Sequence, residues 1–506
     1  MKIDETIEIE SLRNRKAPPE MHPGEFRELG HDLVDRVADF MATIHQQPVT
    51  TAESPAQIRE LLEAVQPLPV RAASPGPLVN RAADLLLDHS LFNGHPRFWG
   101  YITSSAAPIG ILGDFLASAV NANVGAWKLS PMASEIEAQT VRWIAELIGF
   151  PAECGGLLVS GGNMANFVGF LAARTAKAAW DVRRFGLAGP ARRPLRLYAS
   201  TETHTWIHKA ADLFGLGTDA IRWIPVDARQ RMELKVLRRQ IDEDIARGDL
   251  PFLVVGSAGS VSTGAVDRLP EMAGICREYG LWFHVDGAYG AVAATVPGVA
   301  EDLRGLSDAD SVAVDPHKWL YAPLEAGCAL VRRAEDLRGT FSYHPPYYHF
   351  GEEAINYFDF GLQNSRGFRA LKVWLGLQQM GRAGCVRAIA EDILLAQHLR
   401  QLLSDRQEFE VMTQNLSITT FRYVPPDLRP NLGSGETETY MSRLNQELLT
   451  RVESSGEAYL SNALIDNKFA LRLCVVNFRT SLEDIEALPD LVARLGQEAD
   501  SDLRHK

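Results

Sequence analysis

Apolar residues near the start of the chain follow helical spacing. From Leu33 to Ile44 they recur every three or four residues, which predicts an amphipathic helix. A proline-rich connection over residues 55–77 follows, and then a second helical pattern that begins at Leu85. Because this part has apolar faces but little strand pattern, we expect residues 1–100 to form a helical segment that packs on the main domain or on a second subunit.

The middle of the chain alternates short apolar runs with helical patterns, such as those of residues 165–180 and 272–279. This alternation is typical of βαβ units, in which helices join parallel strands. We therefore predict an α/β protein whose residues 101–378 form a large domain around a doubly wound, mostly parallel sheet. The predicted strands are residues 157–159, 195–198, 252–255, 281–285, 311–314 and 328–331.

A smaller unit is expected at the end of the chain. The helical pattern of residues 368–379 leads into it, and residues 417–422 and 469–475 have the composition of strands. Residues 425–436 are rich in turn formers and predict a surface loop. We expect residues 379–506 to form a smaller α+β C-terminal domain.

Composition narrows the class of protein. The 506 residues are 46% hydrophobic and 23% charged, with a formal net charge of -13, so no basic face for nucleic acid is expected. The five cysteines are far apart and lack a CxxC pair, which argues against a disulfide framework or a zinc site. The acidic N-terminus is not a signal peptide, and the longest apolar stretch, interrupted by Asp114, is too short for a bilayer. We expect a soluble cytoplasmic protein with no metal and no membrane contact.

Candidate chemistry lies where predicted strands end, because ligands of doubly wound sheets bind at the carboxyl ends of the strands. Gly161, Gly162 and Asn163 follow one strand, and backbone N–H groups at the start of the next helix suit a phosphate there. A glycine pair in such a loop can also serve only a tight turn. His204 follows the next strand, where its ring can stack on a planar ligand or bond neighbouring backbone.

Two further strand ends carry charged residues. Asp286 ends an apolar strand before Gly287 and Ala288; a protonated pyridine nitrogen would pair with its carboxylate, although aspartate is also a common helix N-cap. Lys318 lies between His317 and Trp319, a costly place for an unpaired ammonium. A lysine here can reach water along its stem, or its amine can form a Schiff base with an aldehyde such as pyridoxal phosphate (PLP).

Together these residues supply a phosphate cradle, a ring-stacking histidine, a carboxylate and a lysine, which PLP requires. In this combination the sequence resembles the group II PLP-dependent amino-acid decarboxylases, the family of the aromatic-L-amino-acid, tyrosine, histidine and glutamate decarboxylases. The resemblance runs from about residue 23 to residue 480. Its motifs are residues 95–101 (HPRFWGY), Trp127, Ser130-Pro131, residues 135–137 (EIE), 160–163 (SGGN), His204, 264–267 (GAVD), 284–289 (HVDGAY), 315–319 (DPHKW) and 471–474 (LRLC).

The resemblance implies a fold type I PLP enzyme that is active as a homodimer with a shared site and releases CO₂ from an L-amino acid. It matches Lys318 to the Schiff-base lysine, Asp286 to the partner of the pyridine nitrogen and His204 to the stacking residue. Ala288 would lie under the ring. Gly161, Gly162, Asn163 and His317 match positions that bind the cofactor, the last three of them in the phosphate loop.

The family also carries a catalytic tyrosine on a mobile loop, and spacing from Lys318 matches it to Tyr347, with Tyr348 as the alternative. Relatives with phenylalanine there form aldehydes by oxidative decarboxylation and deamination, so Tyr347 favours simple decarboxylation to the amine. An aromatic loop of this kind could instead pack on a partner subunit.

Substrate choice is less determined by the resemblance. Tyr101 and Ile102 match positions of the substrate pocket, and an aromatic amino acid is the preferred substrate, with an acidic or diamino acid as the alternative. Asp315 replaces an asparagine of some relatives; since a carboxylate beside phosphate is repulsive, we expect it to turn toward backbone or a basic residue. Arg472 is expected to brace the small domain rather than to bind a substrate carboxylate.

Other classes remain less favoured. An aminotransferase on the same fold is disfavoured by the His-Lys-Trp sequence at the lysine. An interaction protein that had lost catalysis would be expected to lack Lys318 or Asp286, and both are present.

Overall fold

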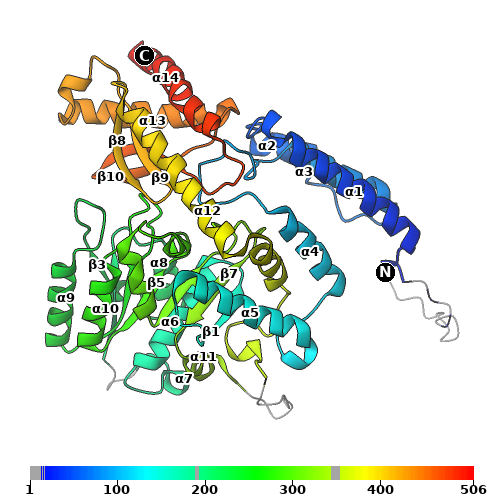
Figure 1. Cartoon of the computed structure of the whole chain (residues 1–506), viewed down its shortest axis with the longest axis horizontal. Coiled ribbons are helices and arrows are strands. Elements are labelled where there is room, and N and C mark those ends of the chain that lie inside the picture. The colour runs from blue at the N-terminus through cyan, green and yellow to red at the C-terminus, as the bar shows by residue number, and fades with distance from the viewer. Residues whose placement is uncertain (1–12, 14, 16, 189–192, 344–353, 506) are drawn as a thin grey trace. The chain divides into compact units, whose positions relative to one another are not determined.

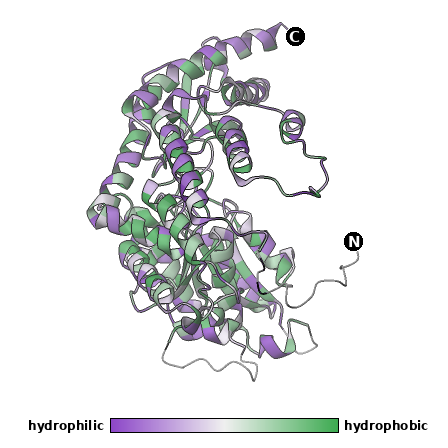
Figure 2. Ribbon diagram, turned by 90° about the vertical axis from the view of Figure 1, so that its right-hand side faces the viewer, coloured by the Kyte–Doolittle hydropathy of each residue, from purple (hydrophilic) through white to green (hydrophobic). Residues whose placement is uncertain are grey.

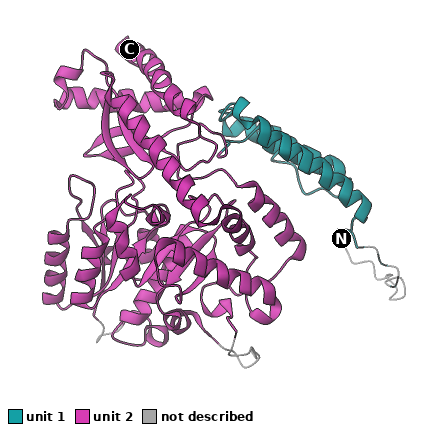
Figure 3. Cartoon of the chain, in the orientation of Figure 1, with its two compact units in different colours: residues 1–92 teal, residues 93–506 magenta. Residues whose placement is uncertain are grey.

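The computed structural model describes residues 13, 15, 17–188, 193–343 and 354–505. The chain divides into two compact units, residues 1–92 and residues 93–506, shown in separate colours in Figure 3. None of the helices in the described part of the chain is long and apolar enough to cross a membrane. The domain boundaries predicted near residues 100 and 378 remain predictions.

The first unit is helical. Its helices are α1 (Pro23–Thr43), α2 (Pro55–Leu61) and α3 (Pro75–Asp88). Each begins at a proline, whose fixed φ and missing N–H suit the first helical turn. The segment predicted as a proline-rich connection therefore contains α2 and the start of α3, and the helix expected to begin at Leu85 in fact ends three residues later.

The second unit contains a seven-stranded sheet in the order β1-β7-β6-β5-β4-β2-β3 (Figure 1). The pairs β2–β3, β2–β4, β4–β5 and β5–β6 are parallel, whereas β7 runs antiparallel to both neighbours. This confirms the α/β class and the mostly parallel sheet. The strands are β1 (Gly155–Val159), β2 (Leu195–Ser200), β3 (Ile221–Ile224), β4 (Leu250–Ser257), β5 (Trp282–Asp286), β6 (Ser311–Val314) and β7 (Gly327–Val331).

Helices cover both faces of this sheet. Successive residues of a strand point to opposite faces, so neighbouring residues of β1 pack in different cores. Leu158 packs in one core with residues of α5, α9 and α10, while Leu157 and Val159 pack in the other with residues of α6, α8 and α11. Figure 2 colours the ribbon by hydropathy, with hydrophobic residues in green. The helices of this region are α4 (Pro108–Val120), α5 (Pro131–Ile148), α6 (Gly162–Lys177), α7 (Val182–Phe185), α8 (Trp206–Leu213), α9 (Leu234–Ala246), α10 (Leu269–Tyr279) and α11 (Ala334–Phe341).

A four-stranded antiparallel sheet, ordered β10-β11-β9-β8, follows the long helix α12 (Ala370–Ser404). Two of its strands were expected from the sequence, whereas β8 and β10 were missed, as was β3 of the large sheet. Helix α12 contains a non-helical residue, Gly381, with φ 61°. The remaining elements are β8 (Phe409–Asn415), β9 (Ile418–Tyr423), α13 (Gly435–Ser455), β10 (Ser461–Ile465), β11 (Lys468–Cys474) and α14 (Leu482–Arg504).

Candidate active site

A cavity of about 360 Å³ lies at the carboxyl ends of the large sheet's strands. Its size falls in the range of about 300–1,000 Å³ that small-molecule sites occupy. Because β7 is antiparallel to both β1 and β6, strands β1 and β6 run in the same direction and end at the same edge. The lining includes nine residues expected from the sequence: Ile102, Gly161, Gly162, Asn163, His204, Asp286, Ala288, His317 and Lys318.

The start of α6 forms the glycine-rich side of the cavity. The first N–H groups of a helix have no carbonyl partner within it, so they are available to an anion. Gly161 has φ 155° and ψ -177°, a conformation rare for other residues. A Cβ on Gly162 would lie 2.7 Å from Asp315 Oδ2, which leaves no room for a side chain. The backbone here fits a phosphate group.

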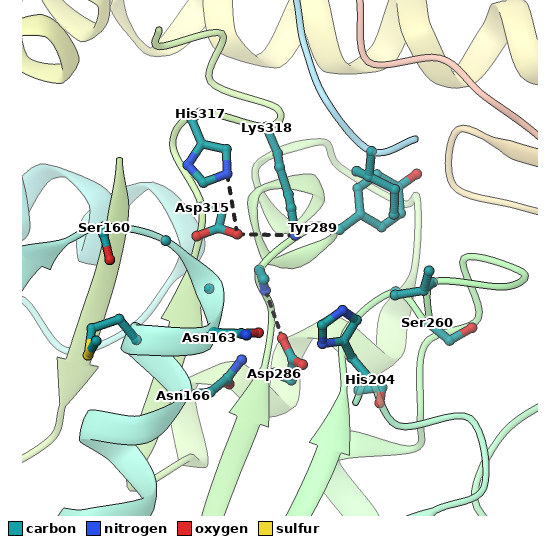
Figure 4. Close-up of a pocket in the computed structure, with 18 of the residues that line it drawn as sticks. Ser160, Asn163, Asn166, His204, Ser260, Asp286, Tyr289, Asp315, His317 and Lys318 are labelled. Atoms are coloured by element: carbon teal, nitrogen blue, oxygen red, sulfur yellow. Dashed lines mark hydrogen bonds and ion pairs between the residues drawn. The ribbon is translucent and has the colours of Figure 1, made fainter. Parts of the chain in front are cut away.

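Asp286 ends β5 and faces the cavity (Figure 4). Its Oδ2 accepts a hydrogen bond from Trp206 Nε1–H at 2.7 Å, and its Oδ1 accepts one from Ala288 N–H at 3.2 Å. These donors orient the carboxylate while leaving it further acceptor capacity, since each carboxylate oxygen has two lone pairs. The arrangement fits a ligand with a protonated ring nitrogen.

His204 lies in the loop between β2 and α8, beside Asp286 in Figure 4. Burial lowers the pKa of its imidazole, an effect that Asp286 opposes and Lys318 reinforces. Trp206 N–H donates to His204 Nδ1 at 3.3 Å, which assigns that nitrogen as an acceptor. A neutral, flat ring at the cavity edge suits stacking on a planar ligand.

Lys318 follows β6 and points into the same space as Asp286 (Figure 4). Its Nζ lies 3.1 Å from Asp315 Oδ2, and His317 Nε2 lies 3.7 Å from the same oxygen. Asp315 thus turns to basic neighbours, as expected. Burial lowers the pKa of His317, whose Nδ1 lies 2.6 Å from Ala326 O and 3.1 Å from Ala326 N.

The carboxylate of Asp315 is unfavourable to a phosphate bound near Gly162, because both groups carry negative charge. Its Oδ1 is buried and has no hydrogen-bond partner in the described part of the chain. The Lys318 ammonium beside it offsets part of its charge, so a phosphate can still bind on the glycine side. The other cavity residues fit PLP: backbone N–H groups for its phosphate, a carboxylate for its ring nitrogen and an amine for its aldehyde.

Of the other residues named from the sequence, the structure describes Tyr101 and Arg472. Tyr101 is not among the residues that line this cavity; it is 54% exposed, and its ring centroid lies 6.0 Å from that of Tyr459. Its substrate role remains a prediction. Tyr347 and its alternative, Tyr348, lie outside the described residues. Arg472 donates to Val261 O, to Gly100 O and to Ser461 Oγ, so it braces β11 against two loops, as expected.

A buried network beneath the cavity was missed by the sequence analysis. His284 Nε2 lies 2.7 Å from Asn166 Oδ1, and its Nδ1 lies 2.7 Å from Ser311 Oγ. Burial lowers the pKa of His284 to about 4, so it is neutral near pH 7. The sequence does show His284, Asn166 and Ser311 as polar residues within apolar elements. It does not show that they meet, because Ser311 lies 27 positions and Asn166 lies 118 positions from His284.

Comparison with known proteins agrees with this geometry. Residues 69–424 match the model of the pyridoxal-dependent decarboxylase conserved domain. The chain is 34% identical over 485 residues to an aromatic-L-amino-acid decarboxylase of Bacillus atrophaeus, covering 94% of this chain and 96% of the relative. It is 31% identical over 472 residues to a phenylacetaldehyde synthase of Petunia hybrida, covering 90% and 91%.

A crystal structure of Oryza sativa TDC with PLP and tryptamine superposes with a TM-score of 0.87 at 26% identity, covering 96% of this chain and 99% of that one. Fold, cavity and sequence thus agree on one chemistry. The chain belongs to the pyridoxal-dependent decarboxylase family and is a carboxy-lyase that uses pyridoxal 5'-phosphate.

Proposed function

We propose that this enzyme releases CO₂ from an aromatic L-amino acid to give the amine, with Lys318 as the residue that bonds the cofactor. The convergence of Lys318, Asp286 and His204 on one cavity carries this proposal. The similarity to an aromatic-L-amino-acid decarboxylase supports the substrate class.

The bound cofactor supplies an electron sink for the bonding electrons that CO₂ leaves behind. In our proposal Asp286, oriented by Trp206 and Ala288, keeps a proton on the ring nitrogen and so strengthens that sink. His204 holds the ring flat by stacking in its neutral form. The N–H groups of Gly162 and Asn163 would bind the phosphate, with His317 as a further residue that contacts it.

We assign Tyr347 as the acid that protonates the substrate carbon after CO₂ loss, with Tyr348 as the alternative. A proton delivered there yields an amine, and a positioned acid is worth roughly 10²–10⁴-fold in rate. The relative from Petunia hybrida, a phenylacetaldehyde synthase, makes aldehyde formation the second candidate. Ile102 lines the cavity and is our candidate for a substrate contact, together with Tyr101.

The deciding experiment loads the protein with PLP and supplies a panel of aromatic, acidic and diamino L-amino acids. CO₂, amine, aldehyde, ammonia and peroxide are measured in the same reactions. Amine equal to CO₂, with aromatic substrates preferred, supports the proposal. Aldehyde with peroxide would replace it by the second candidate, and turnover of acidic or diamino acids alone would refute the aromatic assignment.

We further propose a homodimer with a shared site. One face of α4 carries apolar side chains that are 53–63% exposed, more than a monomer usually leaves uncovered. They are Leu112, Phe115, Leu116 and Val120. Sedimentation equilibrium should give twice the 55.8 kDa chain mass, and Leu116→Lys should shift it toward the monomer.

The shared site has its own test. Co-expression of Lys318→Ala and Tyr347→Phe chains should restore activity in the mixed dimer if each site takes its lysine and tyrosine from different chains. No restoration in purified mixed dimers would refute sharing.

A cytoplasmic location is also proposed, supported by the five cysteines, all of which are free.

A further inference from the structure

Two residues that follow Lys318 donate hydrogen bonds to one buried carboxylate. Trp319 Nε1–H donates to Asp392 Oδ2 at 2.8 Å, and the Tyr321 hydroxyl donates to the same oxygen at 2.9 Å. Asp392 lies on α12 and is 3% exposed. A buried carboxylate is costly unless it is hydrogen-bonded, so these two donors offset the cost of placing Asp392 here.

The backbone that Asp392 restrains is strained. Tyr321 has φ 56°, a left-handed conformation that a bulky side chain rarely adopts. Its N–H donates to Lys318 O at 3.3 Å, and its own carbonyl accepts from Ala107 N–H at 2.8 Å. Residues in such conformations persist only when their surroundings hold them, and the hydroxyl bond to Asp392 is one such restraint.

Trp319 connects the same restraint to the cavity wall. Its ring stacks on Tyr289, with centroids 4.9 Å apart and planes inclined by 12°. Tyr289 lines the cavity, and its hydroxyl lies 2.6 Å from Ser417 Oγ. The residue after Lys318 is therefore held from two sides, by the carboxylate on α12 and by the tyrosine at the cavity.

We propose that Asp392 is a positioning residue, which holds the turn after Lys318 so that the lysine amine enters the cavity oriented to bond the cofactor aldehyde. Asp392 is not among the residues that line the cavity, so it acts through Trp319 and Tyr321. The inference rests on the proposed role of Lys318. It makes the geometry of the lysine depend on Asp392 of helix α12, which lies 73 positions after Trp319.

The charge of Asp392 supplies an independent readout. Burial raises its pKa to about 7, against the effect of the two donors. The titratable groups that face it are Glu391 on α12, Tyr321, Tyr289 and Cys474, and burial raises the pKa of the last three above 10. Near pH 7, Asp392 therefore gains or loses its proton while the two tyrosines and the cysteine stay neutral. Below pH 7 the added proton removes the negative charge of Asp392, so its two hydrogen bonds are no longer charge-assisted and become weaker.

The test compares Asp392→Leu, Asp392→Asn and the control Glu391→Gln, whose side chain is 62% exposed on the same helix. The first readout is the rate at which added PLP becomes reducible by borohydride onto Lys318, identified by peptide mapping. The second is hydrogen–deuterium exchange of residues 316–322 in the cofactor-free protein.

We expect D392L to slow attachment about tenfold, equivalent to about 1.4 kcal/mol, and to raise exchange of the turn. D392N keeps an acceptor oxygen without a charge, so it should stay within about threefold of the wild type at pH 8. The ratio of wild-type to D392N rates should fall as the pH drops from 8 to 6. E391Q should match the wild type in both readouts.

Wild-type attachment and exchange in D392L would overturn the proposal, and a wild-type to D392N ratio that does not change with pH would overturn the role of the charge. If D392L does not fold, Tyr321→Phe and Trp319→Phe remove the donors singly and should each slow attachment about threefold. If the wild type never attaches PLP at Lys318, the proposed function fails, while the exchange experiment still decides the role of Asp392.

Discussion

The ion pair between Lys318 and Asp315 gives the most quantitative test of the site. Its charged atoms lie 3.1 Å apart, and the side chains are 21% and 2% exposed. At that distance an effective dielectric constant of about 20 gives an attraction of about 5 kcal/mol before desolvation is subtracted. Since water reaches the lysine end, we expect a net coupling of about 2 kcal/mol, between surface and fully buried pairs.

The perturbation is a double-mutant cycle in the cofactor-free protein. Lys318→Ala leaves the Asp315 carboxylate buried with only His317 nearby, 3.7 Å away, and should lower the free energy of unfolding by about 2–3 kcal/mol. Asp315→Asn keeps the shape, lets the lysine hydrate and should cost less than about 1 kcal/mol. In the double variant no buried charge is left unpaired, so its stability should lie close to that of Asp315→Asn.

The assay is urea unfolding followed by tryptophan fluorescence, at one protein concentration because the proposed dimer would make the midpoint depend on concentration. Borohydride trapping after PLP is added to the same proteins should show covalent PLP in the wild type and none in Lys318→Ala. Asp315→Asn should bind PLP more tightly, since it removes a negative charge beside the phosphate cradle. Additive single-variant effects, with a coupling below about 0.5 kcal/mol, would refute the reasoning.

Three further predictions follow from single contacts. Gly162→Ala should weaken PLP binding at least tenfold, because its Cβ would lie 2.7 Å from a carboxylate oxygen, whereas Gly274→Ala, with nothing within 4 Å, should bind normally in the same titration. Trp206→Phe should lower kcat about tenfold by removing a charge-assisted hydrogen bond to Asp286, typically worth about 1.5–3 kcal/mol; an unchanged kcat would contradict that role. Burial lowers the pKa of His284 to about 4, so its neutral imidazole contributes to stability near pH 7. As the pH falls from about 6.5 toward 4, the unfolded chain binds the proton before the folded chain does, and that contribution is lost. His284→Asn should reduce the loss of stability between pH 7 and pH 5 by about 2 kcal/mol, and equal slopes for both proteins would exclude the histidine as its source.

Local patterns predicted most of the large sheet, because apolar runs between helical patterns mark buried strands. β3 was missed because it is short and Arg222 breaks its apolar run, and β10 because its polarity does not follow its burial: Ser461 is buried and Leu464 is exposed. The antiparallel direction of β7 left no mark in the sequence, since a buried strand has the same composition in either direction.

The candidate site was predictable for a related reason. Gly162, His204, Asp286 and Lys318 each follow a predicted strand, and the rule that ligands bind at carboxyl ends places them together without coordinates. The partners that orient them were not predictable. Trp206 reaches Asp286 across 80 residues, and neither position shows a local pattern that names the other.

The sequence by itself determined the fold class, the cofactor and most of the residues that line the cavity, because periodicity, turn chemistry and reactive side chains are properties of neighbouring positions. Only the tertiary structure decided what holds those residues in place. The pairing of Lys318 with Asp315, the hydrogen bond from Trp206 to Asp286 and the contact of Asp392 with the turn after Lys318 arise from packing. Packing brings distant segments within hydrogen-bond range, and no spacing along the chain encodes that distance.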